Sequence, residues 1–416
     1  MEALRRLRTS AISWIISQPT VSKVLNEVVD NSRFQAGAEL FLGRKTVTPD
    51  EIVSVLLLCL FAWLLLLRFT PKARLTMWAS VYFCASRDKT MVKSNDENFN
   101  YDKAERRTVI FIRDGESEWD VINKGRTCSR PLKWLRACLK EAWMIFDDES
   151  RCFDSPLSDK GMDEAWELLT FLGSQKDGFS EGDLKSWSDP CYTLNEQDIA
   201  SIIRGDVGDS IVCSSILRRA VSTGVICLSA RLLKMKPEAG NSTSGGSKLP
   251  PEKLMLMTSL QEIGRNIDTL SLTACERLPQ VPRREASMKH MGDIISHFYR
   301  DRLSGMANKG NKDLGTQAKD RQNDFCKWLF KQREDVSVIV CGHSTYFQEF
   351  FKSYLPKASS HRAKQYKLQS CGCVAFDFYT QKDEHDKDLY RIHPERIKTI
   401  FKGFESGATE TTKKAD

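Results

Sequence analysis

Short apolar runs alternate with amphipathic segments along most of the chain after residue 105. The runs are apolar at successive positions and rich in β-branched residues, which is typical of strands covered on both faces. The strand-like runs are 108–112, 210–213, 336–341 and 371–379, and the helix-like segments are 161–172, 216–233, 285–303 and 318–332. Strands that alternate with helices predict an α/β fold over residues 106–402, a three-layer sandwich with a mostly parallel central sheet.

Residues 52–67 have a different pattern, because they are apolar on every face of a helix and Ser54 is their only polar member. A run of this length lies near the lower limit of a bilayer span, and it begins too far from Met1 for a plain signal peptide. We predict a membrane-anchor helix over 51–69, with a buried core helix as the alternative. The other predicted regions are an amphipathic region at 1–50, a juxtamembrane linker at 70–105 and a polar tail at 403–416.

Charge and cysteine content indicate the membrane orientation, the redox compartment and the class of ligand. Basic residues are slightly more numerous after the apolar run (Arg68, Lys72, Arg74, Arg87) than before it (Arg33, Arg44, Lys45). The positive-inside rule therefore predicts a single-pass membrane protein with its large domain facing the cytosol. The 13 cysteines are scattered, with no Cys-x-x-Cys pair, which agrees with a reducing compartment and gives no zinc-like spacing. The net charge of +7 forms no basic block, so we expect an anionic ligand or membrane and no nucleic acid.

Five short motifs follow the predicted elements in order. Residues 113–119 read Arg-Asp-Gly-Glu-Ser-Glu-Trp, 154–161 read Asp-Ser-Pro-Leu-Ser-Asp-Lys-Gly, and 215–223 read Ser-Ile-Leu-Arg-Arg-Ala-Val-Ser-Thr. Leu-Gln-Glu-Ile-Gly stands at 260–264, and Gly-His-Ser at 342–344. Together they resemble the Arg-His-Gly-Glu-Ser-x-Trp signature and the later motifs of the histidine phosphatase (phosphoglycerate-mutase-like) superfamily. The resemblance covers about 290 residues, and the first 105 lie outside it.

The resemblance implies a pocket for a phosphomonoester, which carries close to two negative charges at neutral pH. Arg113 and Arg219 would donate to its oxygens, and His343 would supply a further hydrogen bond. Glu262 would protonate the leaving alkoxide, if burial favours its protonated form. Asp120 stands where the family usually has Asn near the phosphate. The family needs no metal or cofactor, and we expect none here.

Each of these residues also has a structural interpretation when it is taken singly. Arg219 could cap or pair on a helix, His343 could be a satisfied core histidine, and Glu262 could be a surface carboxylate. Their joint order in the family pattern favours a shared pocket.

The main departure from the family is Asp114, which stands where a histidine attacks phosphorus. Its carboxylate oxygen lies roughly 2 Å closer to the backbone than a distal imidazole nitrogen would. An anionic nucleophile also replaces a neutral one beside a dianion, and it is expected to pair with Arg113 and Arg219 and occupy the phosphate pocket itself.

These observations predict a membrane-tethered protein that binds or acts on phosphomonoesters, with catalysis impaired by Asp114. Its expected partner is a phosphorylated small molecule or a phosphoprotein. The alternatives are an active phosphomonoesterase or a phosphoglycerate-type mutase with an unconventional nucleophile, or an active parent into which Asp114 was introduced.

Overall fold

The computed structural model describes residues 55, 57–61, 63–64, 70–88, 99–124, 130–144, 147, 149–175, 195–234, 252–289 and 291–405. The chain divides into two compact units, Met1–Arg74 and Leu75–Asp416. In the first unit, the described positions between 55 and 64 are helical. Helix α5 (Pro71–Ala85) begins in the first unit, and its residues from Leu75 onward belong to the second.

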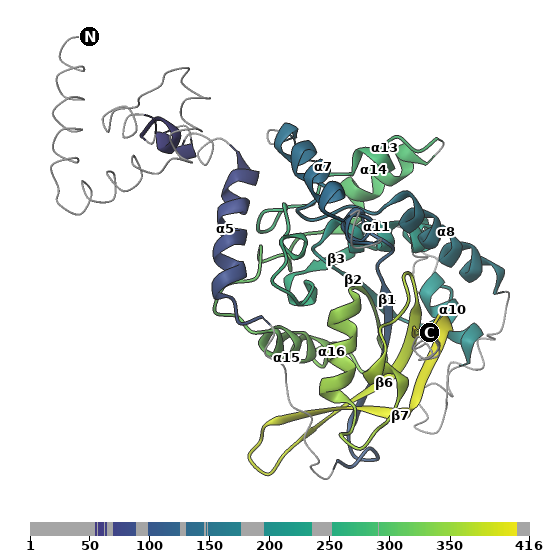
Figure 1. Cartoon of the computed structure of the whole chain (residues 1–416). Helices are drawn as coiled ribbons and strands as arrows, with labels where there is room; N and C mark the ends of the chain where they lie inside the picture. The colour runs from purple at the N-terminus through teal and green to yellow at the C-terminus, as the bar shows by residue number, and fades with distance from the viewer. Residues whose placement is uncertain are drawn as a thin grey trace, which may run out of the picture. The chain divides into compact units, whose positions relative to one another are not determined.

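The second unit is built on one seven-stranded sheet (Figure 1). Its strands are β1 (Glu105–Arg113), β2 (Ser210–Ser215), β3 (Leu254–Met257), β4 (Leu303–Ser304), β5 (Ser337–Gly342), β6 (Cys373–Lys382) and β7 (Asp388–Phe401). In the order β4-β3-β2-β5-β1-β6-β7, the first five strands pair in parallel, while β6 is antiparallel to both of its neighbours. The predicted mostly parallel sheet is confirmed, and each of the four predicted strands overlaps an observed one.

The alternation of side chains along β1 explains why its sequence is apolar throughout. Val109 and Phe111 enter one hydrophobic core, and Ile110 and Ile112 enter another. In the first core, the Phe111 ring stacks on Phe347, with the ring centroids 4.0 Å apart. Because side chains at successive strand positions point to opposite faces, the sheet is buried on both sides.

Helices complete an outer layer on each face, which confirms the predicted three-layer sandwich (Figure 1). Helices α15 (Ala318–Leu329) and α16 (Ser344–Tyr354) supply the first core. The second core receives side chains from α8 (Asp159–Ser174), α10 (Glu196–Arg204), α11 (Arg218–Cys227), α12 (Ser229–Leu233) and α14 (Gly292–Asp301). The remaining helices are α6 (Glu118–Asn123), α7 (Arg130–Trp143), α13 (Arg283–Ala286), α17 (Arg362–Gln365) and the 3₁₀ turns η3 (Thr258–Leu260) and η4 (Ile267–Thr269).

The stretch predicted as a juxtamembrane linker contains structure that packs on the domain. Leu75, Ala79 and Tyr82 of α5 share a hydrophobic cluster with Phe153 and Leu270. At the other end of the chain, Phe404 belongs to the first core. The packed domain therefore extends beyond residues 106–402 at both ends.

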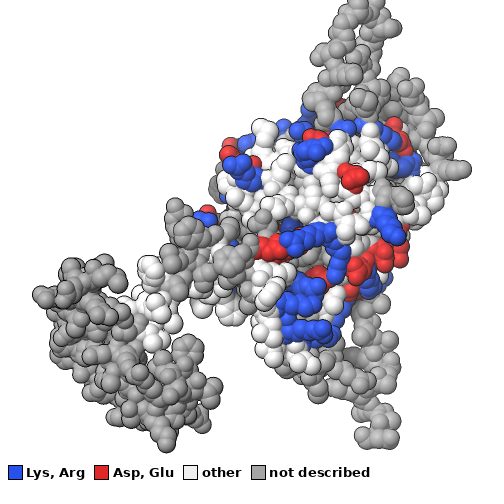
Figure 2. All heavy atoms as spheres, turned by 90° about the horizontal axis from the view of Figure 1, so that it is seen from above, with Lys and Arg blue, Asp and Glu red and all other residues white. Residues whose placement is uncertain are grey.

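Within the described residues, no helix is both long enough and apolar enough to cross a membrane. Part of the predicted anchor 51–69, like all of region 1–50, lies outside the residues that the structure describes. On the described surface seen from above, basic and acidic side chains stand among uncharged ones (Figure 2).

Candidate phosphate-binding site

The carboxyl ends of β1, β2 and β5 bring three of the predicted residues together. Asp114 follows β1 directly, and its N–H donates to the carbonyl of Gly342 at the end of β5, at 2.8 Å. His343 is the next residue after β5, and Arg219 lies in the first turn of α11, which follows β2. Ligands of parallel α/β sheets bind at the carboxyl ends of the strands. Motifs that follow different strands in the sequence therefore lie close together in the structure.

Two motif glycines allow the loop after Asp114 to reach this position. A Cβ atom on Gly115 would lie 2.5 Å from the carbonyl oxygen of Gly161, and one on Gly161 would lie 2.1 Å from that of Glu116. The backbone of the first motif therefore rests directly on the first turn of α8. The Gly115 N–H also donates to Oγ1 of Thr223, the last residue of the third motif, at 3.1 Å.

The Asp114 carboxylate pairs with two of the groups predicted to bind phosphate. Its Oδ2 atom accepts a hydrogen bond from Arg219 Nε at 2.8 Å and also lies 2.8 Å from His343 Nδ1. Burial alone would raise the pKa of Asp114, but His343, Arg219 and Arg113 together hold it below its ordinary value. Asp114 is therefore ionised at neutral pH, and the His343 nitrogen that faces it carries the proton.

The second nitrogen of His343 lies 2.7 Å from Ser215 Oγ, and the side chain is fully buried. Ser215 ends β2 and opens the third motif. The imidazole is thus fixed on both sides by motif residues, which keeps its ring in one orientation. The sequence did not single out Ser215 as a site residue.

The side chain of Glu262 reaches the N-terminus of α16, the helix that follows His343. Its Oε1 atom accepts the backbone N–H groups of Ile263 and Tyr346, at 2.8 and 3.0 Å. Burial alone would lower the pKa of Arg219, but the carboxylates of Asp268, Asp114, Glu262 and Asp120 raise it. Arg219 is therefore the central cation of a group of carboxylates from four separate segments.

Asp268 belongs to this group, although no sequence pattern pointed to it. Its Oδ2 atom lies 3.5 Å from Arg219 NH2, and its backbone carbonyl accepts from Arg219 NH1 at 3.0 Å. Its Oδ1 atom is buried and has no hydrogen-bond partner. Burial raises the pKa of Asp268 to about 6, against the opposing effect of Arg219. Because Asp268 stands in a short polar segment outside any motif, only the tertiary structure shows that it faces Arg219.

The side chains of Arg113 and Asp120 make their hydrogen bonds and ion pairs with residues other than Asp114, Arg219 and His343. Arg113 NH1 donates to the carbonyl of Leu368 and pairs with Glu405 at 3.1 Å. The Asp120 carboxylate accepts from the Ser117 backbone N–H and hydroxyl, at 3.0 and 2.8 Å, and so completes a capping box at the start of α6. The phosphate-binding roles of Arg113 and Asp120 stay predictions.

A second group of buried charges holds the backbone around Glu262. Asp88 pairs with Lys312 Nζ at 2.7 Å and with Arg321 NH2 at 2.5 Å. Lys312 Nζ also donates to the carbonyls of Glu262 and Gly264, at 2.7 and 2.8 Å. The Gly264 N–H in turn donates to Asp88 Oδ2 at 2.9 Å. Asp88 lies in the stretch that the sequence indicated as a linker, so its contact with the site is a finding of the structure.

No group of three or more metal-ligating side chains occurs among the described residues. The described cysteines other than Cys152 are free thiols.

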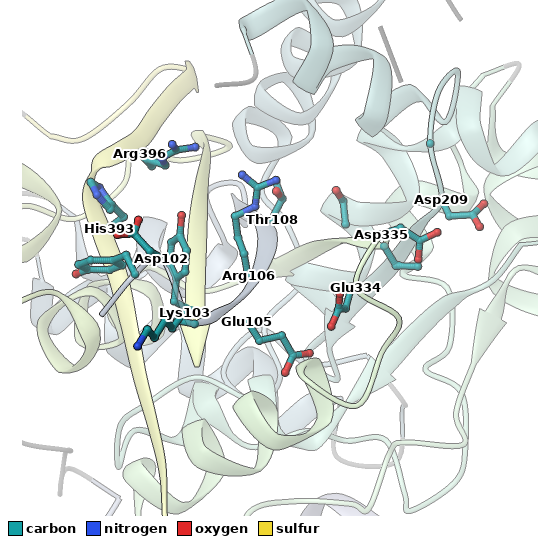
Figure 3. Close-up of a pocket in the computed structure, with 16 residues that line it drawn as sticks. Asp102, Lys103, Glu105, Arg106, Thr108, Asp209, Glu334, Asp335, His393 and Arg396 are labelled. Atoms are coloured by element: carbon teal, nitrogen blue, oxygen red, sulfur yellow. The ribbon is translucent and has the colours of Figure 1, made fainter. Parts of the chain in front are cut away.

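A cavity lies at the opposite ends of the strands, away from Asp114, Arg219 and His343. It has a volume of about 710 Å³ and is bordered by the amino-terminal ends of β1, β2 and β5. In Figure 3, His393 and Arg396 lie toward one end and Asp209 and Asp335 toward the other, with Arg106 between them. None of the predicted site residues lines it.

The fold and the site define a three-layer α/β protein with a cluster of buried charged side chains at the carboxyl ends of its parallel strands. No protein-family model matches the sequence, and no curated protein matches it.

Several solved structures are similar to the chain at low identity. A glucosyl-3-phosphoglycerate phosphatase from a mycobacterium is 11% identical, over 69% of this chain and 98% of its own, with a TM-score of 0.29. A phosphoserine phosphatase from Entamoeba histolytica is 13% identical, over 72% and 98%, with a TM-score of 0.26. A candidate alpha-ribazole-5'-P phosphatase from Escherichia coli is 12% identical, over 70% and 97%, with a TM-score of 0.29.

Proposed function

We propose that the chain binds phosphomonoesters at the pocket around Arg219 and His343, as a histidine-phosphatase-like domain in which Asp114 impairs turnover. One observation carries this proposal: Asp114 Oδ2 lies 2.8 Å from both Arg219 Nε and His343 Nδ1. The carboxylate thereby uses the donors that a phosphoryl oxygen would need. A phosphorylated small molecule or a phosphoprotein must displace it in order to bind.

The charge of the pocket supports impaired turnover. Two like charges 4 Å apart repel by about 4 kcal/mol at an effective dielectric constant of 20, and a phosphomonoester brings nearly two negative charges to Asp114. Asp268 adds a second carboxylate beside Arg219. Arg219 must release Asp114 in order to bind the phosphate, whereas attack by Asp114 would bring its negative charge up to the phosphate. Binding and attack therefore oppose each other.

The second candidate is an active phosphomonoesterase or mutase, and the ionised state of Asp114 favours it. In that reaction a carboxylate oxygen bonds to phosphorus while the bond from phosphorus to the leaving oxygen breaks. A general acid, the role that the resemblance assigns to Glu262, must protonate that oxygen, and water then hydrolyses the aspartyl phosphate to restore the Asp114 carboxylate and release phosphate.

A phosphatase assay separates the two candidates. We expect Asp114→His to raise the rate of 4-nitrophenyl phosphate hydrolysis about a hundredfold or more, because the imidazole restores both the reach and the neutral charge of the nucleophile. Asp114→Asn, the matched control, has no nucleophile and should give no such gain. It should instead bind inorganic phosphate about tenfold more tightly in calorimetry, because the repelling charge is gone. Comparable turnover by the unmodified chain would show that Asp114 is a working nucleophile.

Residues 52–67 are proposed to tether this domain to a membrane, with the domain in the cytosol. The apolar run and the excess of basic residues after it support the tether and its orientation, and the unpaired cysteines agree with a reducing compartment. If the run spans a bilayer, the protein stays with membranes after alkaline extraction, and Leu58→Arg with Leu64→Arg releases it.

A further inference from the structure

Helix α7 (Arg130–Trp143) exposes a line of large apolar side chains. Leu132, Leu135, Leu139 and Trp143 are 70%, 57%, 64% and 91% exposed. Their spacing of three and four residues places them on one face of the helix. A soluble helix ordinarily buries such a face.

The opposite face of α7 is the one that packs on the domain. Ala137 is buried in the cluster that also contains Phe153, and Trp134 meets the edge of Trp119, with ring centroids 5.1 Å apart. The exposed leucines therefore do not belong to the face of α7 that packs on the domain core. They form a second apolar face, directed away from it.

The charged side chains of α7 are basic except for Glu141. Lys133, Arg136 and Lys140 lie between the exposed apolar positions, and no acidic residue occurs from 130 to 140. Glu141 accepts the backbone N–H groups of Arg151 and Cys152, so its charge is directed to the domain. In Figure 1, α7 lies at the top, on the side from which Figure 2 is viewed.

We propose that α7 is an interfacial helix that docks on an anionic lipid bilayer. The leucine stripe enters the boundary between headgroups and acyl chains, Trp143 lies at the level of the headgroups, and the three cations contact anionic lipid headgroups. This combination of an apolar stripe flanked by Lys133, Arg136 and Lys140 is the pattern of a membrane-surface helix. The proposal does not depend on the phosphatase function or on a span at 52–67.

Flotation with vesicles tests the proposal on the full chain carrying Leu58→Arg and Leu64→Arg, so that residues 52–67 do not contribute. We expect binding to vesicles with 30% phosphatidylserine and at least tenfold weaker binding to phosphatidylcholine alone. Adding Leu135→Glu and Leu139→Glu should reduce the bound fraction at least tenfold. The matched control is Leu233→Glu, which changes a leucine of similar exposure (53%) on α12 and should have no effect.

Three outcomes overturn the proposal. The first is absence of binding to the anionic vesicles, and the second is binding that Leu135→Glu with Leu139→Glu leaves unchanged. The third is a dimer, found by sedimentation without lipid, that this pair of substitutions dissociates while vesicle binding is absent; the stripe would then bind a second copy of the chain. Because the substituted leucines are exposed, thermal unfolding of the variants should match that of the parent and so exclude misfolding.

Discussion

At the residue scale, one cation is shared by carboxylates that the sequence keeps far apart. Arg219 contacts Asp114 through Nε and Asp268 through NH2. The two carboxyl groups differ in charge state because their partners differ. Asp114 also has His343, and its pKa is lowered, whereas Asp268 has an unpartnered oxygen and a raised pKa. Below about pH 6 the Asp268 carboxyl is mainly protonated, and above it the group adds a second negative charge beside Arg219.

Asp268 should make stability depend on pH. Its pKa is higher in the folded protein (about 6) than in the unfolded chain, so the folded state binds more protons between about pH 4 and 6 and loses stability as the pH rises through that window. We expect the free energy of unfolding to fall by up to about 1.4 kcal/mol per pH unit from this group. Asp268→Asn should flatten this slope, as measured by urea unfolding from pH 4 to 7. The control Asp163→Asn, at an exposed position of α8, should leave the slope unchanged; an unaltered slope in Asp268→Asn would contradict the assignment.

At the element scale, the first turn of α8 is fixed by backbone contact. Gly161 leaves no space for a Cβ atom beside the Glu116 carbonyl, whereas Gly173, near the other end of the same helix, has no atom within 4 Å of its Cβ direction. A glycine usually weakens a helix, so Gly161 is retained against local preference because the Asp114 loop passes there.

This contrast gives a matched pair of substitutions in one helix. Gly161→Ala should destabilise the protein by about 1–3 kcal/mol through overpacking, and it should displace the loop that carries Asp114. Gly173→Ala should stabilise by up to about 1 kcal/mol, because alanine has the better helix propensity. Thermal unfolding of both variants measures the difference, and equal stabilisation by both would show that the close approach of the two backbones is absent.

At the scale of the whole molecule, Asp88 connects the segment after α5 to the site. The residue is fully buried, and it neutralises Lys312 and Arg321, which hold the carbonyls of Glu262 and Gln261. Burial lowers the pKa of Lys312 to about 8 even with Asp88 beside it. Without that carboxylate, two buried cations would remain next to each other.

Asp88→Asn should therefore destabilise the backbone at residues 261–264, although Asp88 is far from them in the sequence. We expect a loss of about 3–5 kcal/mol in the free energy of unfolding and at least tenfold faster amide hydrogen exchange at residues 261–264. Asp377→Asn is the matched control, since Asp377 on β6 pairs with Arg106 and Arg396, which line the cavity at the amino-terminal ends of the strands. Exchange at 261–264 that responds equally to both substitutions would reflect general destabilisation instead of a local contact.

The sequence by itself determined the elements whose signals are local. The buried strand at 108–112 was predicted from its continuous apolar run, and the ordered motifs predicted that Asp114, Arg219 and His343 would meet. The spacing of Tyr346, Phe347, Phe350, Phe351 and Tyr354 is also helical and would have allowed α16 to be predicted. The edge strand β7 was missed because its polar and half-buried positions resemble a loop.

Only the tertiary structure decided which charges are paired. Asp268 and Asp88 carry no pattern of their own, and the carboxylate of Asp120 caps α6. The physical reason is that periodicity and motifs report interactions between residues that are near one another in sequence. The pairing of a buried charge depends instead on which distant segments fold against it, and on how completely they exclude water.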